Sequence, residues 1–267
     1  MKHLILGGRS YLATKYAEYL SLNNEDTFVL NEVNSNFYSK TSLFKKIEKT
    51  NPNIIYDFKF PMVTSDDKKF SKINSINILN IQKELIETLN NLSSNKSKII
   101  VISSKNVNKV NSLYSQYKKN QENIYKTNLD RKNNLTIFRS PSVLGEGDLS
   151  ENRLTPFFFR NIFQKSEVNL SINSNRVGEF IFINNFCKNL FYLTKNQKTE
   201  LDILKIKYKN LILLYSSILK FELNFDHVVF WNGKKLEIEK DFLDQDYIVD
   251  LRKLTNWYFT NMYKLNL

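Results

Sequence analysis

Three short stretches of this chain carry residue types that can bind a dinucleotide and reduce a carbonyl group. Residues 7–13 follow an apolar N-terminal run, and a tight turn before a helix can hold a pyrophosphate there. Ser104 ends a later apolar run, and Tyr114 and Lys118 follow it. A tyrosine can protonate a carbonyl oxygen as hydride arrives if a nearby cation lowers its pKa from about 10. In this order the three stretches predict an oxidoreductase.

The first stretch has the spacing of a dinucleotide-binding turn and departs from it at one position. Gly7 supplies the first turn position, and Ala13 is compact enough for the third. Ser10 stands at the second position, where its Cβ can hinder a pyrophosphate. A strand–turn–helix without a ligand is the alternative. We expect five residues of this turn to contact the cofactor: Gly7, Arg9, Ser10, Tyr11 and Leu12.

Two positions bear on the choice of cofactor. Asn31 follows the second expected strand, where an acidic residue would bind both ribose hydroxyls of NAD. A neutral Asn31 together with a nearby Arg9 favours NADP(H), because a guanidinium can pair with a 2′-phosphate. If Glu32 reaches the ribose instead, the preference changes to NAD(H).

The spacing of the later residues fits a proton-donating set. Tyr114 and Lys118 lie four residues apart, so they project from one face of a helix, and the hydroxyl of Ser104 can bond the substrate oxygen. Tyr117 lacks such a partner, because Gln121 rather than a cation stands four residues later. With 14 tyrosines in the chain, a chance match is the alternative. We expect Ser104, Tyr114 and Lys118 to be catalytic.

The composition fits a globular protein with a basic surface. Its 267 residues are 42% hydrophobic and 25% charged, which suffices for a buried core and excludes wholesale disorder. The formal charge of +12 comes from scattered residues rather than a basic tail, so we expect no nucleic-acid partner. The positive excess suits a substrate with a pyrophosphate, with Arg139 and Arg153 as candidate anion partners. Arg160 is better explained by a structural ion pair.

The sequence has too few cysteines and histidines for disulfide or metal chemistry. Cys187 is the only cysteine, which excludes an internal disulfide, and its apolar neighbours predict burial. His3 and His227 are isolated, so we expect no metal site. No apolar stretch approaches the ~20 residues of a membrane span, and the N-terminal run is too short for a signal peptide. We therefore expect a cytoplasmic protein with no membrane partner.

Alternating apolar runs and helical periodicity in the first half predict an α/β fold, a Rossmann-type doubly wound parallel sheet. The expected strands are residues 3–6, 27–30, 54–58, 98–102 and 135–138, and the expected helices are 13–22, 41–49, 73–92 and 112–128. Later the alternation loosens, with a strand expected at 180–183 and helices at 155–163, 184–193, 211–219 and 251–263. We expect a dinucleotide-binding core over residues 1–144 and a small substrate-binding lobe over 145–267, with 178–195 returning to the core.

Several stretches resemble the extended short-chain dehydrogenase/reductase superfamily, the NAD-dependent epimerase/dehydratase family. The resemblance spans roughly residues 1–195 and rests, beside the catalytic set, on residues 74 and 80, 103–107, 138–145 and 180–185. It implies that Asn74 and Phe58 lie at the cofactor and that Ser142 lies at the substrate. It also implies that Lys118 binds the cofactor by bonding the nicotinamide ribose. Phe58 replaces a small residue of the family's nicotinamide-ribose wall. The resemblance further implies a homodimer through helices 73–92 and 112–128.

The departures from the family narrow the expected activity. Lys105 and Asn106 stand where a dehydratase carries Asp-Glu after its catalytic hydroxyl residue. The chain is therefore most similar to the 4-keto-sugar reductases, such as the dTDP-4-dehydrorhamnose reductase group. We expect an NADP(H)-dependent reductase of a nucleotide-linked 4-keto-deoxy sugar in surface-polysaccharide precursor synthesis. The alternatives are an NAD-dependent nucleotide-sugar epimerase and a non-catalytic dinucleotide-binding or regulatory protein on the same fold.

Overall fold

The structure is a computed structural model of the chain. It describes residues 1–8, 10–30, 45, 47–58, 72–91, 96–108, 113–130, 134–150, 153–173, 175–195, 197, 201–243 and 247–263, without the side chains of 72–81, 113 and 242. The chain divides into two compact units. The first comprises Met1–Pro141 and Phe186–Glu200, and the second comprises Ser142–Asn185 and Leu201–Leu267.

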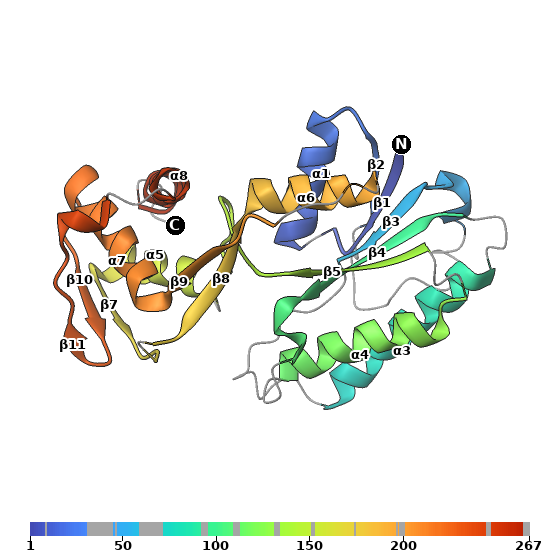
Figure 1. Cartoon of the computed structure of the whole chain (residues 1–267), viewed down its shortest axis with the longest axis horizontal. Coiled ribbons are helices and arrows are strands. Elements are labelled where there is room, and N and C mark those ends of the chain that lie inside the picture. Colours follow the sequence, from blue (N-terminus) through green and yellow to red (C-terminus); the bar gives the residue numbers. More distant parts are fainter. Residues whose placement is uncertain are drawn as a thin grey trace. The chain divides into compact units, whose positions relative to one another are not determined.

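The first unit is built on a five-stranded, all-parallel sheet (Figure 1). Its order is β2-β1-β3-β4-β5, and the strands are β1 (Lys2–Leu6), β2 (Asp26–Leu30), β3 (Ile54–Asp57), β4 (Lys98–Ser104) and β5 (Leu135–Ser140). The order reverses between β1 and β3, so the carboxyl ends of these strands form a topological switch point. Such points bind ligands in open α/β sheets. The expected α/β Rossmann-type fold is confirmed.

Helices cover both faces of this sheet (Figure 1). The helices α1 (Tyr11–Leu22) and α6 (Ile183–Thr194) lie on one face, and α3 (Lys72–Asn91) and α4 (Leu113–Asn128) lie on the other. A 3-10 turn at Lys105–Asn108 links β4 toward α4. Strands covered on both sides read as continuous apolar runs, which is why the sequence predicted them. Leu4, Ile55 and Val101 from three neighbouring strands are all buried in one core with residues of α3 and α4.

The expected elements of the first unit differ from the observed ones mainly at their ends. The helix expected at residues 13–22 begins at Tyr11, because Ser10 caps it. The strands expected to end at residues 102 and 138 continue to Ser104 and Ser140, which pair with each other in the β4–β5 register. The helix expected at 41–49 lies largely outside the described residues.

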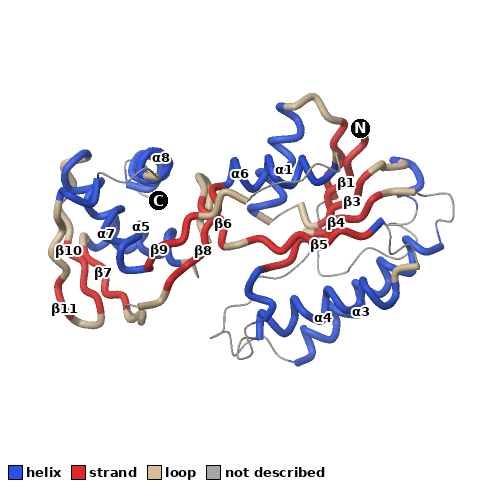
Figure 2. Tube along the Cα trace, viewed as in Figure 1, coloured by secondary structure: helices blue, strands red, loops and turns tan. Residues whose placement is uncertain are grey.

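The second unit contains two three-stranded sheets, shown in red in Figure 2, with their own core. One sheet has the order β6-β8-β9 and comprises β6 (Ser142–Leu144), β8 (Val177–Phe182) and β9 (Leu204–Lys207). The other has the order β11-β10-β7 and comprises β7 (Glu167–Leu170), β10 (Val228–Trp231) and β11 (Lys234–Lys235). The helices are α5 (Leu154–Lys165), α7 (Tyr208–Ser217) and α8 (Ile248–Tyr258), with a 3-10 turn at Lys240–Leu243. The helices α7 and α8 each continue as a π-helical segment, Ile218–Glu222 and Phe259–Tyr263.

Candidate active site

The turn after β1 requires glycine at its first position. Gly7 has a φ of 79°, a left-handed backbone that side-chain-bearing residues rarely adopt. The amide of Ser10 donates to the carbonyl of Gly7 at 3.0 Å, and the amide of Gly8 donates to the carbonyl of Leu30 at 3.2 Å. The turn is thus closed on itself and tied to the end of β2.

Ser10 has a structural reason to differ from glycine. It is the N-cap of α1, and its Oγ accepts a hydrogen bond from the amide of Ala13 at 3.3 Å. Tyr11 and Leu12 are the first two residues of this helix, and Ala13 is fully buried. The amides and the dipole at a helix N-terminus favour an anion. The described residues of this turn thus place the N-terminus of α1 beside it, and the pyrophosphate contact stays a prediction.

Three residues of the expected cofactor site lie outside the described part of the chain. Arg9, Asn31 and Glu32 are not among the described residues, and Asn74 is described only by its backbone in α3. The choice between NADP(H) and NAD(H) therefore stays a prediction. Phe58 follows β3 and is buried, with its ring centroid 6.1 Å from that of Tyr16. Its ring thus packs in the core, and its expected contact with the cofactor stays a prediction.

Lys118 is held against the end of the central strand β4. It is buried in α4, and its Nζ donates to the carbonyl of Ile102 at 2.8 Å and to Oε1 of Gln121 at 3.0 Å. Burial lowers the pKa of Lys118 to about 8, while the negative charges of Asp57 and Glu122 raise it. The protein therefore holds a buried, weakly screened cation at the carbonyl of Ile102, two residues before Ser104.

The other two residues of the expected catalytic set are Ser104 on β4 and Tyr114 on α4. Ser104 is buried at the end of β4, and its Oγ accepts a hydrogen bond from the amide of Asn106 at 3.1 Å. Tyr114 is half-buried in the first turn of α4, one turn before Lys118. The structure thus attaches Lys118 to the strand that ends in Ser104. The approach of the Tyr114 phenol to either residue stays a prediction.

A buried carboxyl group that sequence analysis missed lies beside Lys118. Asp57 ends β3 and is fully buried, and its Oδ2 accepts hydrogen bonds from Tyr125 Oη at 2.6 Å and from Gln121 Nε2 at 3.5 Å. Gln121 and Tyr125 follow Lys118 in α4 by three and seven residues. That spacing places all three on one helix face, and it could have revealed the cluster.

Arg139, expected as an anion partner, pairs with a carboxylate of α4. Its Nε and Nη2 donate to the two carboxylate oxygens of Glu122 at 2.9 and 2.6 Å. The Oγ of Ser103 donates to the same carboxylate at 2.6 Å, and Lys126 lies 3.4 Å from it. Burial alone would raise the pKa of Glu122, but the hydrogen bonds from Arg139 and Ser103 hold it below its ordinary value. The guanidinium of Arg139 is thus tied to Glu122, and its expected contact with a substrate anion stays a prediction.

Two of the expected substrate residues, Arg153 and Ser142, lie in the second unit. Arg153 is partly exposed, and its Nη1 donates to Oδ2 of the buried Asp148 at 2.8 Å. Ser142 is exposed at the start of β6. The Nη2 of Arg160 donates to the carbonyl of Leu149 at 2.8 Å, a structural contact, and the ion pair that we expected stays a prediction.

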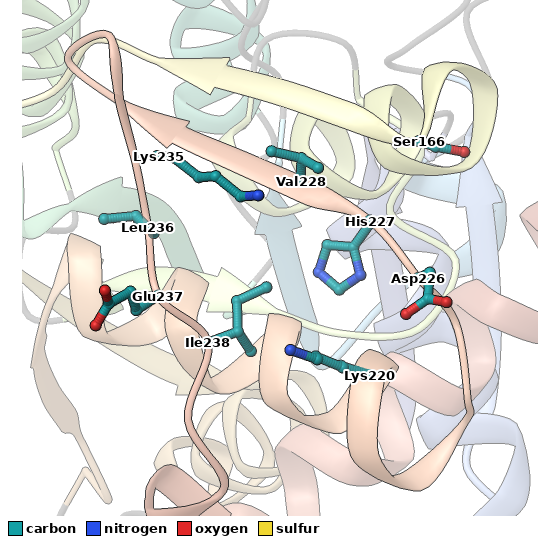
Figure 3. A pocket seen from close by; sticks show the side chains of 9 residues that line it. All are labelled: Ser166, Lys220, Asp226, His227, Val228, Lys235, Leu236, Glu237 and Ile238. Atoms are coloured by element: carbon teal, nitrogen blue, oxygen red, sulfur yellow. The ribbon is translucent and has the colours of Figure 1, made fainter.

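A pocket of about 760 Å³ lies within the second unit, and Figure 3 shows the side chains that line it. Its lining residues are Ser166, Lys220, Asp226, His227, Val228, Lys235, Leu236, Glu237 and Ile238. The lining contains two lysines and two carboxylates, so the formal charges balance. The Nδ1 of His227 lies 2.9 Å from the carbonyl of Phe225, so this nitrogen carries the proton. Burial lowers the pKa of His227. The lining includes none of the residues that we expected to bind cofactor or substrate.

Three further observations concern the described residues. They contain no group of three or more His, Cys, Asp or Glu side chains that could hold a metal ion. Among the helices of this part of the chain, none has the length and apolar character needed to cross a membrane. Cys187 is buried, and burial raises the pKa of its thiol to about 12.

Comparison with solved structures identifies the fold. Neither a protein-family model nor a curated protein sequence matches the chain. The dTDP-4-dehydrorhamnose reductase from Yersinia enterocolitica matches with a TM-score of 0.68 at 15% identity, over 96% of this chain and 99% of that one. The NAD-dependent NDP-hexosamine 5,6-dehydratase TunA matches with a TM-score of 0.70 at 13% identity, over 98% and 99%. RMD from Pseudomonas aeruginosa, solved with NADPH, matches with a TM-score of 0.71 at 11% identity, over 97% and 99%.

These three proteins share one fold with this chain. Each is matched over nearly its full length, and so is this chain. The chain therefore shares the fold of these three proteins, and membership of the extended short-chain dehydrogenase/reductase superfamily stays what the sequence resemblance implies.

Proposed function

We propose that this chain is an NADP(H)-dependent reductase of a nucleotide-linked 4-keto-deoxy sugar that serves surface-polysaccharide precursor synthesis, with NAD(H) as the alternative cofactor. The observation that carries the proposal is the buried ammonium of Lys118, bound to β4 two residues before Ser104 and one helical turn after Tyr114. The fold supports it, because the structures that match include a dTDP-4-dehydrorhamnose reductase and an enzyme complexed with NADPH.

In this proposal the two parts of the chain bind different molecules. Residues 1–144 bind the dinucleotide, with the turn at Gly7, Ser10, Tyr11 and Leu12 holding its pyrophosphate. Residues 145–267 bind the nucleotide sugar; of the segment 178–195, which we expected to return to the core of the first part, the residues from Phe186 onward belong to the first unit. In the substrate lobe Asp148 orients the guanidinium of Arg153, so Arg153 is the candidate for binding a substrate phosphate.

The chemistry follows from the hydrogen bonds of three side chains. Bound NADP(H) would supply the hydride. The Oγ of Ser104 accepts the amide hydrogen of Asn106, so its own hydroxyl hydrogen can be donated to the keto oxygen. Tyr114 delivers its phenolic proton to that oxygen. The ammonium of Lys118 stabilises the resulting phenolate, and because Lys118 is buried its charge is little screened by water.

One observation favours the non-catalytic alternative, a dinucleotide-binding protein without turnover. Lys118 already donates to Ile102 and Gln121, and a lysine with internal acceptors can be purely structural. Substitution of Lys118 by Met separates the two functions. In a reductase this change weakens dinucleotide binding and abolishes turnover, whereas a structural lysine affects only the free energy of unfolding.

The proposal is tested by following NADPH absorbance with a panel of nucleotide-linked 4-keto sugars. We expect oxidation of NADPH with at least one sugar, and slower oxidation of NADH. A nucleotide sugar interconverted with its epimer in the presence of NAD, without net change in absorbance, would indicate the epimerase. Binding of NADPH with no turnover of any sugar would support the dinucleotide-binding protein. The homodimer, the cytoplasmic location and the lack of a nucleic-acid partner stay predictions.

A further inference from the structure

A buried polar chain leads from β3 to Lys118. Its members are Asp57, Tyr125, Gln121 and Lys118, of which the first three are completely buried and Lys118 is 5% exposed. Tyr125 donates to Asp57 at 2.6 Å, Gln121 Nε2 lies 3.5 Å from the same oxygen, and Lys118 Nζ donates to Gln121 Oε1 at 3.0 Å. A buried polar group without a hydrogen-bond partner lowers the stability of the fold, so the bonds along this chain hold each of the four side chains in one orientation.

The orientation of the Gln121 carboxamide follows from its two neighbours. An ammonium has only hydrogens to donate, and a carboxylate has only oxygens to accept them. The amide nitrogen therefore faces Asp57 and the amide oxygen faces Lys118. Burial is the first cause that raises the pKa of Tyr125, and the charge of Asp57 adds to it. Tyr125 consequently remains a phenol that donates to the carboxylate.

We propose that Asp57 and Gln121 are positioning residues for Lys118, with Asp57 supplying the buried negative charge that keeps Lys118 an ammonium and Gln121 aligning its Nζ. The part of the proposal that concerns catalysis rests on the proposed function. The part that concerns the charge and position of Lys118 does not.

Two carboxylates act on Lys118, and they are not equivalent. Among the described residues these charges come from Asp57 on β3 and Glu122 on α4, and Asp57 has the larger effect. Glu122 is bound by Arg139 and lies near Lys126, so two cations offset its charge. Two side chains that donate to Asp57, those of Tyr125 and Gln121, are neutral.

The negative charge of Asp57 matters because burial favours the neutral form of Lys118. Its pKa is already lowered to about 8. Without Asp57 the charged form would lose an attractive partner in a medium of low dielectric, and the pKa would fall further. At neutral pH a larger fraction of Lys118 would then be a neutral amine, which can neither stabilise a phenolate at Tyr114 nor bind as a cation.

The test measures the titration of Lys118 directly, by NMR of protein labelled at the lysine side chains, with Lys118→Met to assign its resonance. In Asp57→Asn we expect the pKa of Lys118 to fall by about one unit or more. Asp130→Asn, at an exposed carboxylate beyond the end of α4, is the matched control and should leave it unchanged. An unchanged pKa in folded Asp57→Asn would overturn the proposal.

Gln121→Glu keeps the proposal testable if Asp57→Asn fails to fold. It adds a carboxylate where the amide oxygen now meets Lys118, so we expect the pKa of Lys118 to rise. A fall or no change would contradict the positioning of Nζ by this side chain.

Activity separates the proposal from the proposed function. For an active enzyme, the alkaline limit of kcat/KM should move to lower pH in Asp57→Asn, because Lys118 loses its proton earlier. A shifted NMR titration with no hydride transfer by the wild type would reject the reductase and leave the positioning of Lys118 standing.

Discussion

The guanidinium of Arg139 binds the buried carboxylate of Glu122 through two atoms, Nε at 2.9 Å and Nη2 at 2.6 Å. Arg139 lies on β5 and Glu122 lies on α4, one turn after Lys118. Ser103 on β4 donates to the same carboxylate. The pair therefore joins the helix of the proposed catalytic residues to the two strands beneath it, and bidentate contacts of this kind fix geometry as well as charge.

Glu122→Gln should destabilise the protein, because it weakens the bonds from Arg139 and Ser103 within a buried site. We expect a loss of about 1–3 kcal/mol in the free energy of unfolding, measured with urea. Glu18→Gln, at an exposed glutamate of α1, is the matched control and should change little. Equal stability of Glu122→Gln and the wild type would show that the contact contributes nothing.

Glu122 should also make the stability of the protein depend on pH. The folded-state pKa of Glu122 lies below its ordinary value, so the unfolded chain binds a proton more readily. Its contribution is present above the ordinary carboxyl pKa of about 4.3 and is lost as pH falls through the folded-state pKa. Urea titrations at acidic pH should show a smaller loss of stability in Glu122→Gln than in the wild type. Parallel losses in both proteins would contradict this assignment.

Substitutions at Ser10 separate its capping role from its effect on a ligand. Ser10→Ala removes the bond to the amide of Ala13 and should cost about 0.5–2 kcal/mol, whereas Ser10→Gly should cost only a few tenths. Ser10→Gly also removes the Cβ, so we expect it to bind NADPH at least as tightly as the wild type. Calorimetric titration with NADPH measures this. Weaker binding by Ser10→Gly would argue against a pyrophosphate at this turn.

Gly7→Ala tests the backbone of the turn. A Cβ at a φ of 79° is strained, so we expect a loss of about 1–2 kcal/mol in stability together with weaker NADPH binding. Thermal unfolding and the same titration provide the measurements. A variant as stable as the wild type would mean that the turn does not require this conformation.

The thiol of Cys187 should be inert in the folded protein, because its pKa is about 12 and the thiolate is the reactive form. Iodoacetamide should label it only when the protein is unfolded in guanidinium. Rapid labelling without denaturant would contradict its burial.

The fold of the first unit could be predicted because its strands are covered on both faces. The strand β4 is apolar from Ile99 to Ile102, and such runs separated by helical periods indicate a parallel sheet. The second unit lacked this signal. Its strands β6 and β11 have three and two residues, too few to show alternation, so the sequence predicted only the strand at residues 180–183 there.

The candidate site was predictable where spacing alone fixes geometry. The four-residue interval from Tyr114 to Lys118 and the glycine at the first turn needed no knowledge of packing. The partner of Arg139 could not be read in this way, because a charged residue at a strand end suits a substrate as well as an ion pair. Asp57 was missed for a similar reason, since a carboxylate inside an apolar strand shows its role only when Gln121 and Tyr125 are brought against it.

The central claim is that Tyr114 delivers a proton in a carbonyl reduction. Its most direct test is the rate of NADPH oxidation with a nucleotide-linked 4-keto sugar, compared for the wild type, Tyr114→Phe and Tyr117→Phe. We predict a loss of about 10²–10⁴-fold in kcat for Tyr114→Phe, with NADPH binding retained, and little change for Tyr117→Phe. Equal rates for Tyr114→Phe and the wild type would contradict the account.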